Sequence, residues 1–172
     1  MALRHVAVLR LQEPAVTAAT PQTLAELSPD QLARACADAM WTNDHASKAL
    51  GMEIVEIGAG SATLAMTVTT DMVNGHGIAH GGFIFTLADS AFAYACNSYN
   101  DSTVAAQGAI TFIRPGKLGA RLVAAAREVS LSGRSGIYDV RVTSGQTVIA
   151  EFRGHSRSIG GTLVPPQQPD PR

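Results

Sequence analysis

Several features that mark specialised classes of protein are scarce or missing in this sequence. Its 13 basic residues do not outnumber the 14 acidic ones, and the net charge is −1. Because nucleic-acid-binding proteins normally carry a basic excess or stripe, no nucleic-acid partner is expected. No run approaches the ~18 apolar residues needed to cross a bilayer, so no membrane partner is expected either.

Signs of secretion are also missing. Arg4, His5 and Arg10 interrupt the first apolar run, whereas a secretory signal needs about 7–15 uninterrupted apolar residues. The only two cysteines, Cys36 and Cys96, lie in apolar, helical-looking segments, which favours reduced core thiols over a disulfide or a reactive thiol. These features predict a cytoplasmic protein.

Apolar residues make up 46% of the 172 residues, which suffices for one domain with a core but not for two ordinary domains. We expect this domain to span residues 29–163. Residues 1–28 carry scattered prolines and threonines without a persistent period, which predicts a flexible extension; a short helix from Thr23 is the alternative. Residues 164–172 contain four prolines and should be disordered.

One long apolar helix, residues 83–98, is expected between two groups of strands. Ser28 before Pro29 predicts the start of an earlier helix, which residues 43–44 should interrupt before a last turn at 46–50. Apolar and alternating runs predict six strands, at residues 52–57, 62–68, 104–113, 121–129, 136–143 and 147–158.

This order of elements predicts an α+β fold. No helix separates the last four strands, which excludes parallel βαβ units and favours an antiparallel meander. The helix of residues 83–98 is apolar on nearly every side, so the sheet should wrap around it. A second copy of the chain is the simplest cover for its outer face.

Asp89 is the one carboxylate inside that apolar helix. Its neighbours three and four positions away are Phe85, Thr86, Phe92 and Ala93, so burial should raise its pKa. A raised pKa prepares a carboxylate to act as a general base or a nucleophile. The alternative is a solvent-facing aspartate at one edge of the helix.

The residues before the helix suggest an oxyanion site. The first N–H groups of a helix have no partner within it and carry partial positive charge. Gly81 and Gly82 would let a substrate approach these groups closely, and Asn74 and His80 add polar groups able to hold a water or a carbonyl. An ordinary glycine-rich helix start is the alternative.

The spacing of these residues constrains the site. Gly81 and Asp89 are eight residues apart, which is ~12 Å along a helix. A base and an oxyanion donor must both lie within a few ångströms of the carbonyl they share. One copy of the helix cannot supply both groups, whereas two antiparallel copies can. The site is therefore predicted to lie across a dimer interface.

Other catalytic patterns are missing. His76 and His80 have the i, i+4 spacing of zinc ligands, but neighbouring glycines favour a loop and no third ligand is evident. The chain has no G-x-S-x-G elbow, no P-loop lysine motif and no dinucleotide fingerprint. No metal and no cofactor are expected.

The residues around Asp89 resemble those of the hot-dog-fold thioesterases, specifically the phenylacetate-degradation (PaaI) branch. The likeness lies in residues 74–82 and 87–98 and continues at 112–116, 136–140 and 152–154. It implies a long helix wrapped by an antiparallel sheet, paired into dimers and commonly tetramers. It also implies metal-independent hydrolysis of acyl-CoA thioesters, with aryl-acetyl-CoA esters as substrates.

By this resemblance Asp89 would be the base or nucleophile, and the Gly81 N–H would polarise the thioester carbonyl in the partner subunit's site. His80 would support that carbonyl or orient Gly81, and Asn74 would help to hold the attacking water. Some relatives place a serine or threonine at the start of the strand after the helix. Ala105 stands there in this sequence, which puts that helper role in doubt.

The phosphates of CoA need cations near the mouth of the pocket. Arg114, Lys117, Arg134 and Arg157 lie in or beside turns, although each alone is more typical of a solvated surface charge; the resemblance ranks Arg134 first. Two other functions stay open. One is an acyl-thioester dehydratase or hydratase of the same fold, and the other is a non-catalytic acyl-CoA-binding module.

Overall fold

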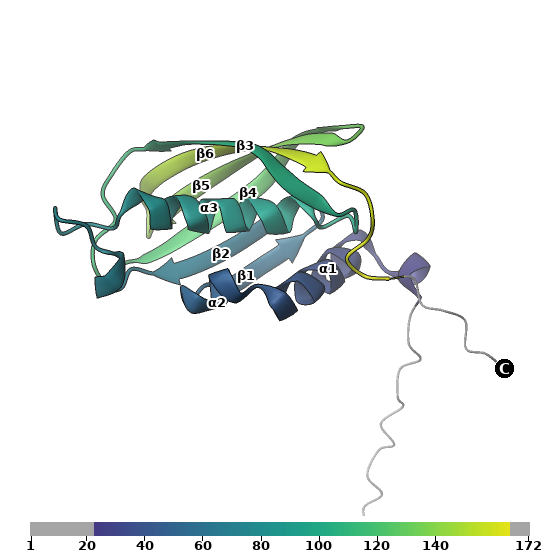
Figure 1. Ribbon diagram of the computed structural model, residues 1–172, viewed down its shortest axis with the longest axis horizontal. Helices are drawn as coiled ribbons and strands as arrows, with labels where there is room; N and C mark the ends of the chain where they lie inside the picture. The colour runs from purple at the N-terminus through teal and green to yellow at the C-terminus, as the bar shows by residue number, and fades with distance from the viewer. Residues whose placement is uncertain (1–22, 166–172) are drawn as a thin grey trace, which may run out of the picture.

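The computed structural model describes residues 23–165, so most of the extension expected at residues 1–28 and of the tail expected at residues 164–172 lies outside that range. A six-stranded antiparallel sheet wraps around one long helix, with two shorter helices at one side of the sheet (Figure 1). A three-residue 3-10 helix, Leu24–Glu26, precedes these two helices. It lies where the sequence offered a short helix from Thr23 as the alternative to a flexible extension. Within the described range, no helix is both long and apolar enough to cross a bilayer.

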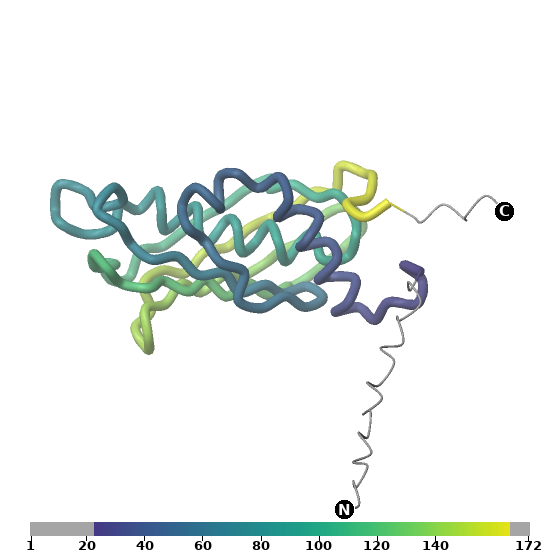
Figure 2. Tube along the Cα trace, turned by 90° about the horizontal axis from the view of Figure 1, so that it is seen from below, coloured from purple at the N-terminus to yellow at the C-terminus, as the bar shows by residue number. Residues whose placement is uncertain are grey.

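The two shorter helices begin where side chains satisfy their free backbone N–H groups. Ser28 caps α1 (Pro29–Asn43), whose first residue is the expected proline. Asp44 ends α1 and caps α2 (His45–Ala49), since its Oδ1 accepts the Ser47 N–H at 3.0 Å. The predicted interruption between the helices is therefore confirmed. Both helices lie nearest the viewer in Figure 2.

All strand pairs in the sheet are antiparallel. The strands are β1 (Glu53–Gly58), β2 (Ser61–Thr67), β3 (Thr103–Phe112), β4 (Arg121–Ser132), β5 (Ser135–Ser144) and β6 (Thr147–Ser158). Their ends lie within one residue of the prediction, except that β4 continues past the predicted end at Val129. The cause is the two-residue turn at Gly133–Arg134, where Gly133 adopts φ +56° and lets the strands pair up to the turn.

The predicted meander of four strands is wrong for β3. The strand order is β1-β2-β4-β5-β6-β3, so only β4, β5 and β6 form successive hairpins. β3 pairs with β6 at the edge of the sheet, while β4 pairs with β2. Residues 113–120 carry the chain from that edge to the centre. Periodicity indicates which face of a strand is buried, but it does not identify the neighbouring strand.

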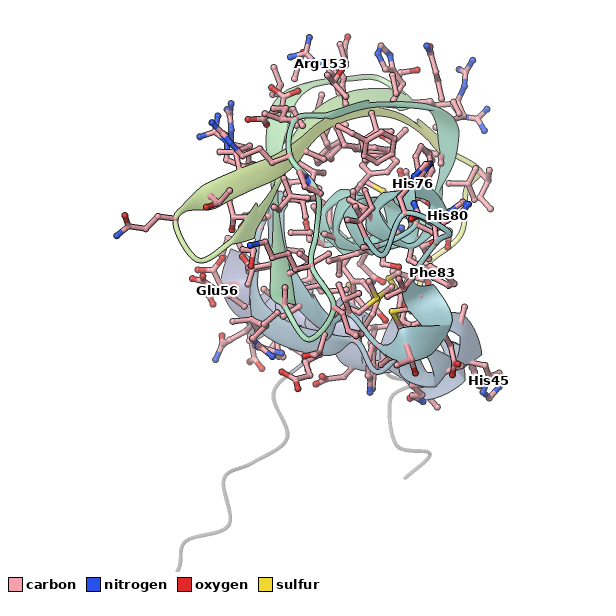
Figure 3. The ribbon with its side chains drawn as sticks, turned by 90° about the vertical axis from the view of Figure 1, so that its left-hand side faces the viewer. His45, Glu56, His76, His80, Phe83 and Arg153 are labelled. Atoms are coloured by element: carbon pink, nitrogen blue, oxygen red, sulfur yellow. The ribbon has the colours of Figure 1, made fainter. Side chains whose placement is uncertain are left out.

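The long helix α3 (Gly81–Cys96) starts and ends two residues before the predicted span. Seen along its axis, the sheet curves around it (Figure 3). Half of its residues are buried: Ile84, Leu87, Ala88, Ala91, Phe92, Tyr94, Ala95 and Cys96. Burial raises the pKa of the Cys96 thiol to about 12, and both Cys36 and Cys96 are buried free thiols, as predicted. The apolar character of α3 therefore follows from its place inside the sheet.

Two glycines let α3 approach the sheet closely. Gly108 on β3 and Gly154 on β6 face each other across the strand pair. A β-carbon at position 154 would lie 2.9 Å from three ring atoms of Phe92, and one at position 108 would lie 3.0 Å from Phe152. The Phe92 and Phe152 rings are themselves packed with their centroids 5.9 Å apart. The aromatic part of the core therefore fills the space that the glycines leave.

The N-terminal helices cover part of the side of α3 that the sheet leaves open. The Tyr94 hydroxyl donates to Asp44 Oδ2 at 3.0 Å, and the hydroxyl oxygens of Ser47 and Ser90 lie 3.2 Å apart. The chain thus supplies some of the cover that was expected from a second copy. The turn of α3 that carries Asp89 stays partly exposed.

Replacing Gly154 with alanine should lower the free energy of unfolding by about 1–3 kcal/mol, because the added methyl group meets the fully buried ring of Phe92. Gly75→Ala is the matched control, since nothing lies within 4 Å of its β-carbon position and its φ is not left-handed. That variant should be neutral or slightly stabilised. Urea denaturation of both at one protein concentration tests this, and equal stabilities would contradict it.

Candidate active site

The first residue of α3 follows a short loop that the rest of the chain holds in place. The His80 N–H donates to the Met72 carbonyl at 2.8 Å, and the Ala79 N–H donates to the Gly116 carbonyl at 2.9 Å. His80 is the N-cap of α3, and its Nδ1 accepts the Gly82 N–H at 3.0 Å. The neutral imidazole must therefore carry its proton on Nε2. His76 and His80 lie together at this end of α3 in Figure 3.

The N–H of Gly81 differs from that of Gly82. Gly82 donates to the His80 ring, whereas the Gly81 N–H has no hydrogen-bond partner among residues 23–165. It sits at the first position of the helix, where the partial positive charge of the helix end is concentrated. Of the two glycines considered from the sequence, Gly81 is the one with a donor available to a ligand.

Gly81 opens onto a pocket of about 470 Å³, within the size range of small-molecule sites. The lining residues are Asn74, Ile78, Ala79, Gly81, Ile84, Phe112, Ile113, Arg114 and Pro115. Asn74 Oδ1 accepts the His76 N–H at 2.9 Å, which leaves its Nδ2 group as a second available donor at the pocket. The structure therefore brings Asn74, Gly81 and Arg114 together at one pocket.

Asp89 lies two turns further along α3. Its side chain is partly buried, and desolvation raises the pKa of its carboxyl above the ordinary value of 3.8. In the described part of the chain, no cation or hydrogen-bond donor pairs with this carboxylate. The predicted direction of the pKa shift is thus confirmed, and its cause is burial alone.

The structure keeps Asp89 away from the pocket at Gly81. Both residues belong to one uninterrupted α-helix, so eight residues separate them by ~12 Å along its axis. Asp89 is not among the residues that line the pocket. Within one chain, the carboxylate and the free N–H cannot reach the same small group.

The four basic residues proposed for CoA divide between the two ends of the sheet. Arg114 lines the Gly81 pocket, and Lys117 follows in the same loop, bridged through its backbone to Ile78. Arg134 lies in the turn between β4 and β5, and this turn is at the end of the sheet opposite the start of α3 (Figure 1). Its Nε and Nη2 both donate to the Ser158 carbonyl, at 3.1 and 2.7 Å. Arg134 therefore already has a structural role in holding this turn to β6.

Arg157 is placed differently. It lies on β6 beside a polar groove of about 370 Å³ on the outer face of the sheet. The groove is lined by Ala106, Gln107, Ser130, Ser132, Ser135, Gly136, Ile137, His155, Ser156 and Arg157. No acidic residue lines it, and no acceptor within residues 23–165 engages the Arg157 guanidinium.

The described residues contain no cluster of three or more His, Cys, Asp or Glu side chains able to hold a metal ion. His76 and His80 are both exposed in the loop before α3, and His80 Nδ1 is engaged as the helix cap. Sequence reasoning missed one prominent lining residue, Phe112. The available signal was an aromatic residue at the end of β3, directly before the loop that carries Arg114.

Comparison with known proteins identifies the family. Residues 76–151 match the thioesterase superfamily. The acyl-coenzyme A thioesterase PaaI of Escherichia coli K12 is 46% identical over 129 residues, which cover 74% of this chain and 92% of that protein. This chain belongs to the thioesterase superfamily. It is a hydrolase of the PaaI type, as the sequence predicted.

Solved structures agree on the fold. The structure of the E. coli PaaI protein from the phenylacetic acid degradation operon matches this chain with a TM-score of 0.77 at 45% identity, covering 78% of this chain and 99% of that one. A Streptococcus mutans protein solved with bound acetyl CoA matches with a TM-score of 0.62 at 28% identity, covering 64% and 90%. The predicted hot-dog fold is thus confirmed for this thioesterase.

The raised pKa of Asp89 has a consequence for stability. Because the folded chain disfavours the ionised carboxylate, the contribution of Asp89 to the free energy of unfolding is greatest below pH 3.8 and falls as the pH rises through the raised value. Asp89→Asn stays neutral throughout. It should therefore unfold with a higher free energy than the wild type at pH 7, and the difference should shrink as the pH approaches 3.8.

Urea denaturation at pH 7 and pH 4, at fixed protein concentration, measures this difference. Asp38→Asn, which changes an exposed carboxylate on α1, is the control and should alter the free energy of unfolding little at either pH. An Asp89→Asn variant less stable than the wild type at pH 7 would contradict the assignment.

Proposed function

We propose that this thioesterase hydrolyses acyl-CoA thioesters, with aryl-acetyl-CoA esters as its substrates. The observation that carries the proposal is the free N–H of Gly81, which begins α3 at the edge of an apolar pocket. A donor so placed stabilises the oxygen of a thioester carbonyl as it gains negative charge. The name of the E. coli relative, an acyl-coenzyme A thioesterase, supports the substrate class.

Asp89 supplies the other half of the reaction. As a general base it takes a proton from water while the water oxygen attacks the carbonyl carbon, and the carbonyl electron pair moves onto the oxygen held by Gly81. The intermediate then collapses, the C–S bond breaks, and the CoA thiolate recovers the proton. Direct attack by Asp89, through an anhydride that water then cleaves, gives the same products.

The environment of Asp89 suits this role. A carboxylate in water is a weak base, whereas desolvation raises the pKa of Asp89 towards the working pH. Its lack of a cationic partner within residues 23–165 keeps that pKa from being lowered again. The carboxylate is thus partly withdrawn from solvent and free to accept a proton.

The active site is shared by two subunits, with Asp89 of one chain facing Gly81 of the partner subunit. The edge strand β3 supports this arrangement. It is ten residues long, contains neither a charged residue nor proline, and has no strand partner on its outer edge among the described residues. Long uncharged edges of this kind pair readily with another chain.

Pairing β3 with its own copy would extend the sheet and set the two α3 helices side by side in opposite directions. That geometry brings each Asp89 towards Gly81 of the partner subunit and covers the partly exposed turn of α3 that carries Asp89. The dimer is thus the smallest active unit. The tetramer and the cytoplasmic location remain predictions from the sequence.

His80 and Asn74 support the oxyanion site. By capping α3 through Nδ1, His80 fixes the backbone next to Gly81, so its role is to orient that donor. Asn74 Nδ2 is the second donor at the pocket and is placed to hold the attacking water or the carbonyl. Neither residue needs a change of charge for this function.

For the phosphates of CoA, Arg157 is a better candidate than Arg134. The Arg157 guanidinium stands beside a polar groove without acidic residues, whereas Arg134 is already bonded to Ser158. Arg114 and Lys117 would then lie nearer the acyl end. A structural relative bound to acetyl CoA supports a CoA ester as the ligand.

Asp89→Asn should lower kcat by about 10²–10⁴-fold, because the amide cannot accept the proton. Thiol release from phenylacetyl-CoA, followed with a thiol reagent, measures the rate, and size-exclusion chromatography checks that the oligomer is intact. Retention of most of the activity towards every acyl-CoA tried would contradict the role of Asp89.

Gly81→Pro tests the oxyanion donor. Proline is tolerated at the first helical position and removes the N–H, and His80 already has the extended backbone that precedes proline. Gly81→Ala is the matched control, because it adds a β-carbon and keeps the N–H. We expect the proline variant to lose about 10²–10³-fold in kcat relative to the alanine variant. Equal rates would show that this N–H is not used.

A panel of acyl-CoA esters distinguishes the thioesterase from the dehydratase and from the binding module. A dehydratase would convert a 3-hydroxyacyl-CoA without releasing thiol, and a binding module would hold acyl-CoA esters without turnover. Phenylacetyl-CoA turning over no faster than long fatty acyl-CoA would refute the aryl-acetyl assignment and leave the thioesterase reaction in place.

A further inference from the structure

The pocket beside Gly81 is suited to the acyl group of the substrate rather than to the CoA arm. Apart from Asn74 and Arg114, its walls are apolar side chains and glycine. The CoA arm contains two amides, whose burial against apolar walls without hydrogen bonds would cost free energy. A hydrocarbon acyl group has no such requirement.

Phe112 is the lining residue with the closest relation to the oxyanion donor. A β-carbon at position 81 would lie 2.8 Å from Cζ of Phe112, and 3.2 and 3.3 Å from the two Cε atoms. The tip of the ring therefore rests directly over the α-carbon of Gly81. The ring can occupy this place only because residue 81 has no side chain.

Within a single chain, residues 23–165 leave the remainder of the Phe112 ring uncovered. The residue is 52% exposed, although it lines the pocket and, as the last residue of β3, is still paired with Ala150. A single exposed aromatic residue on a protein surface needs no explanation. Here, however, the exposed ring stands beside an unpaired helix N–H, at the place where the proposed substrate carbonyl must bind.

We propose that Phe112 determines the acyl specificity of this thioesterase by packing its ring against an aromatic acyl group bound in the Gly81 pocket. This inference rests on the proposed function. With the carbonyl oxygen at the Gly81 N–H, the acyl group extends from the carbonyl carbon along the wall that Phe112 forms. Offset or edge-to-face packing of two rings is favourable beyond the area it buries, which an aliphatic chain cannot match.

The test compares phenylacetyl-CoA with hexanoyl-CoA on the full-length protein. Phe112→Leu keeps an apolar wall and removes the ring, so the ratio of kcat/KM for the aryl substrate to that for the alkyl substrate should fall about three- to tenfold. Phe112→Tyr should preserve the ratio. Leu118→Ala is the matched control, since Leu118 is also 52% exposed but does not line the pocket.

Gly81→Ala gives a second readout. Its β-carbon must push the Phe112 ring aside, so it should shift the same ratio in the same direction while retaining the N–H. Binding of both CoA esters to the Asp89→Asn variant, measured by calorimetry, should show the same loss of aryl preference on adding Phe112→Leu.

The outcomes separate the two proposals. If the wild type releases no thiol from either ester, the proposed function fails, and the calorimetric ratio still tests Phe112. If both esters turn over but Phe112→Leu leaves the ratio unchanged, or lowers both rates equally, the specificity role is wrong. If Phe112→Leu dissociates the oligomer and leaves the ratio of the two kcat/KM values unchanged, the specificity role is wrong and Phe112 instead packs between subunits.

Discussion

One α-helix carries both groups that the proposed chemistry requires, and its rigidity keeps them apart. Among residues 23–165 the N–H of Gly81 has no hydrogen-bond partner because it begins α3, and burial of Asp89 further along the same helix raises the pKa of its carboxyl. The rise of an α-helix separates them by ~12 Å. A helix cannot shorten that distance without losing its hydrogen bonds, so the two groups must serve different reaction centres unless a second helix is brought beside the first.

The remaining structure holds α3 in the position that this arrangement needs. The sheet curves around the helix, and Gly108 and Gly154 allow the aromatic core to approach it without a gap. The loop before α3 is hydrogen-bonded to its neighbours, and His80 closes it as the helix cap, so the free N–H points from a fixed backbone. On the opposite side, Asp44 bonds to Tyr94 and steadies the helix beyond Asp89. The packing around α3 thus leaves the Gly81 N–H and the Asp89 carboxylate available for the proposed reaction.

Much of this could be predicted from the sequence, because the decisive signals are local. A carboxylate in an apolar helix and two glycines at its start depend on residues that are neighbours in the chain, and helix geometry alone gave their separation. The place of β3 at the sheet edge was not predictable, since strand pairing depends on contacts between distant segments. The same limit applies to the contacts of Phe112 and Arg134. Phe112 rests on Gly81 and Arg134 is bonded to Ser158, and both contacts join residues that are distant in the chain.

The most direct test of the shared site is complementation between two inactive variants. Mixing Asp89→Asn subunits with Gly81→Pro subunits should produce mixed dimers in which one of the two sites combines an intact Asp89 with an intact Gly81. Random exchange makes about half of the dimers mixed, each with one working site, so thiol release should recover to about a quarter of the wild-type rate. Native mass spectrometry would establish that exchange has occurred. Mixed dimers no more active than the two parent variants would contradict the shared site.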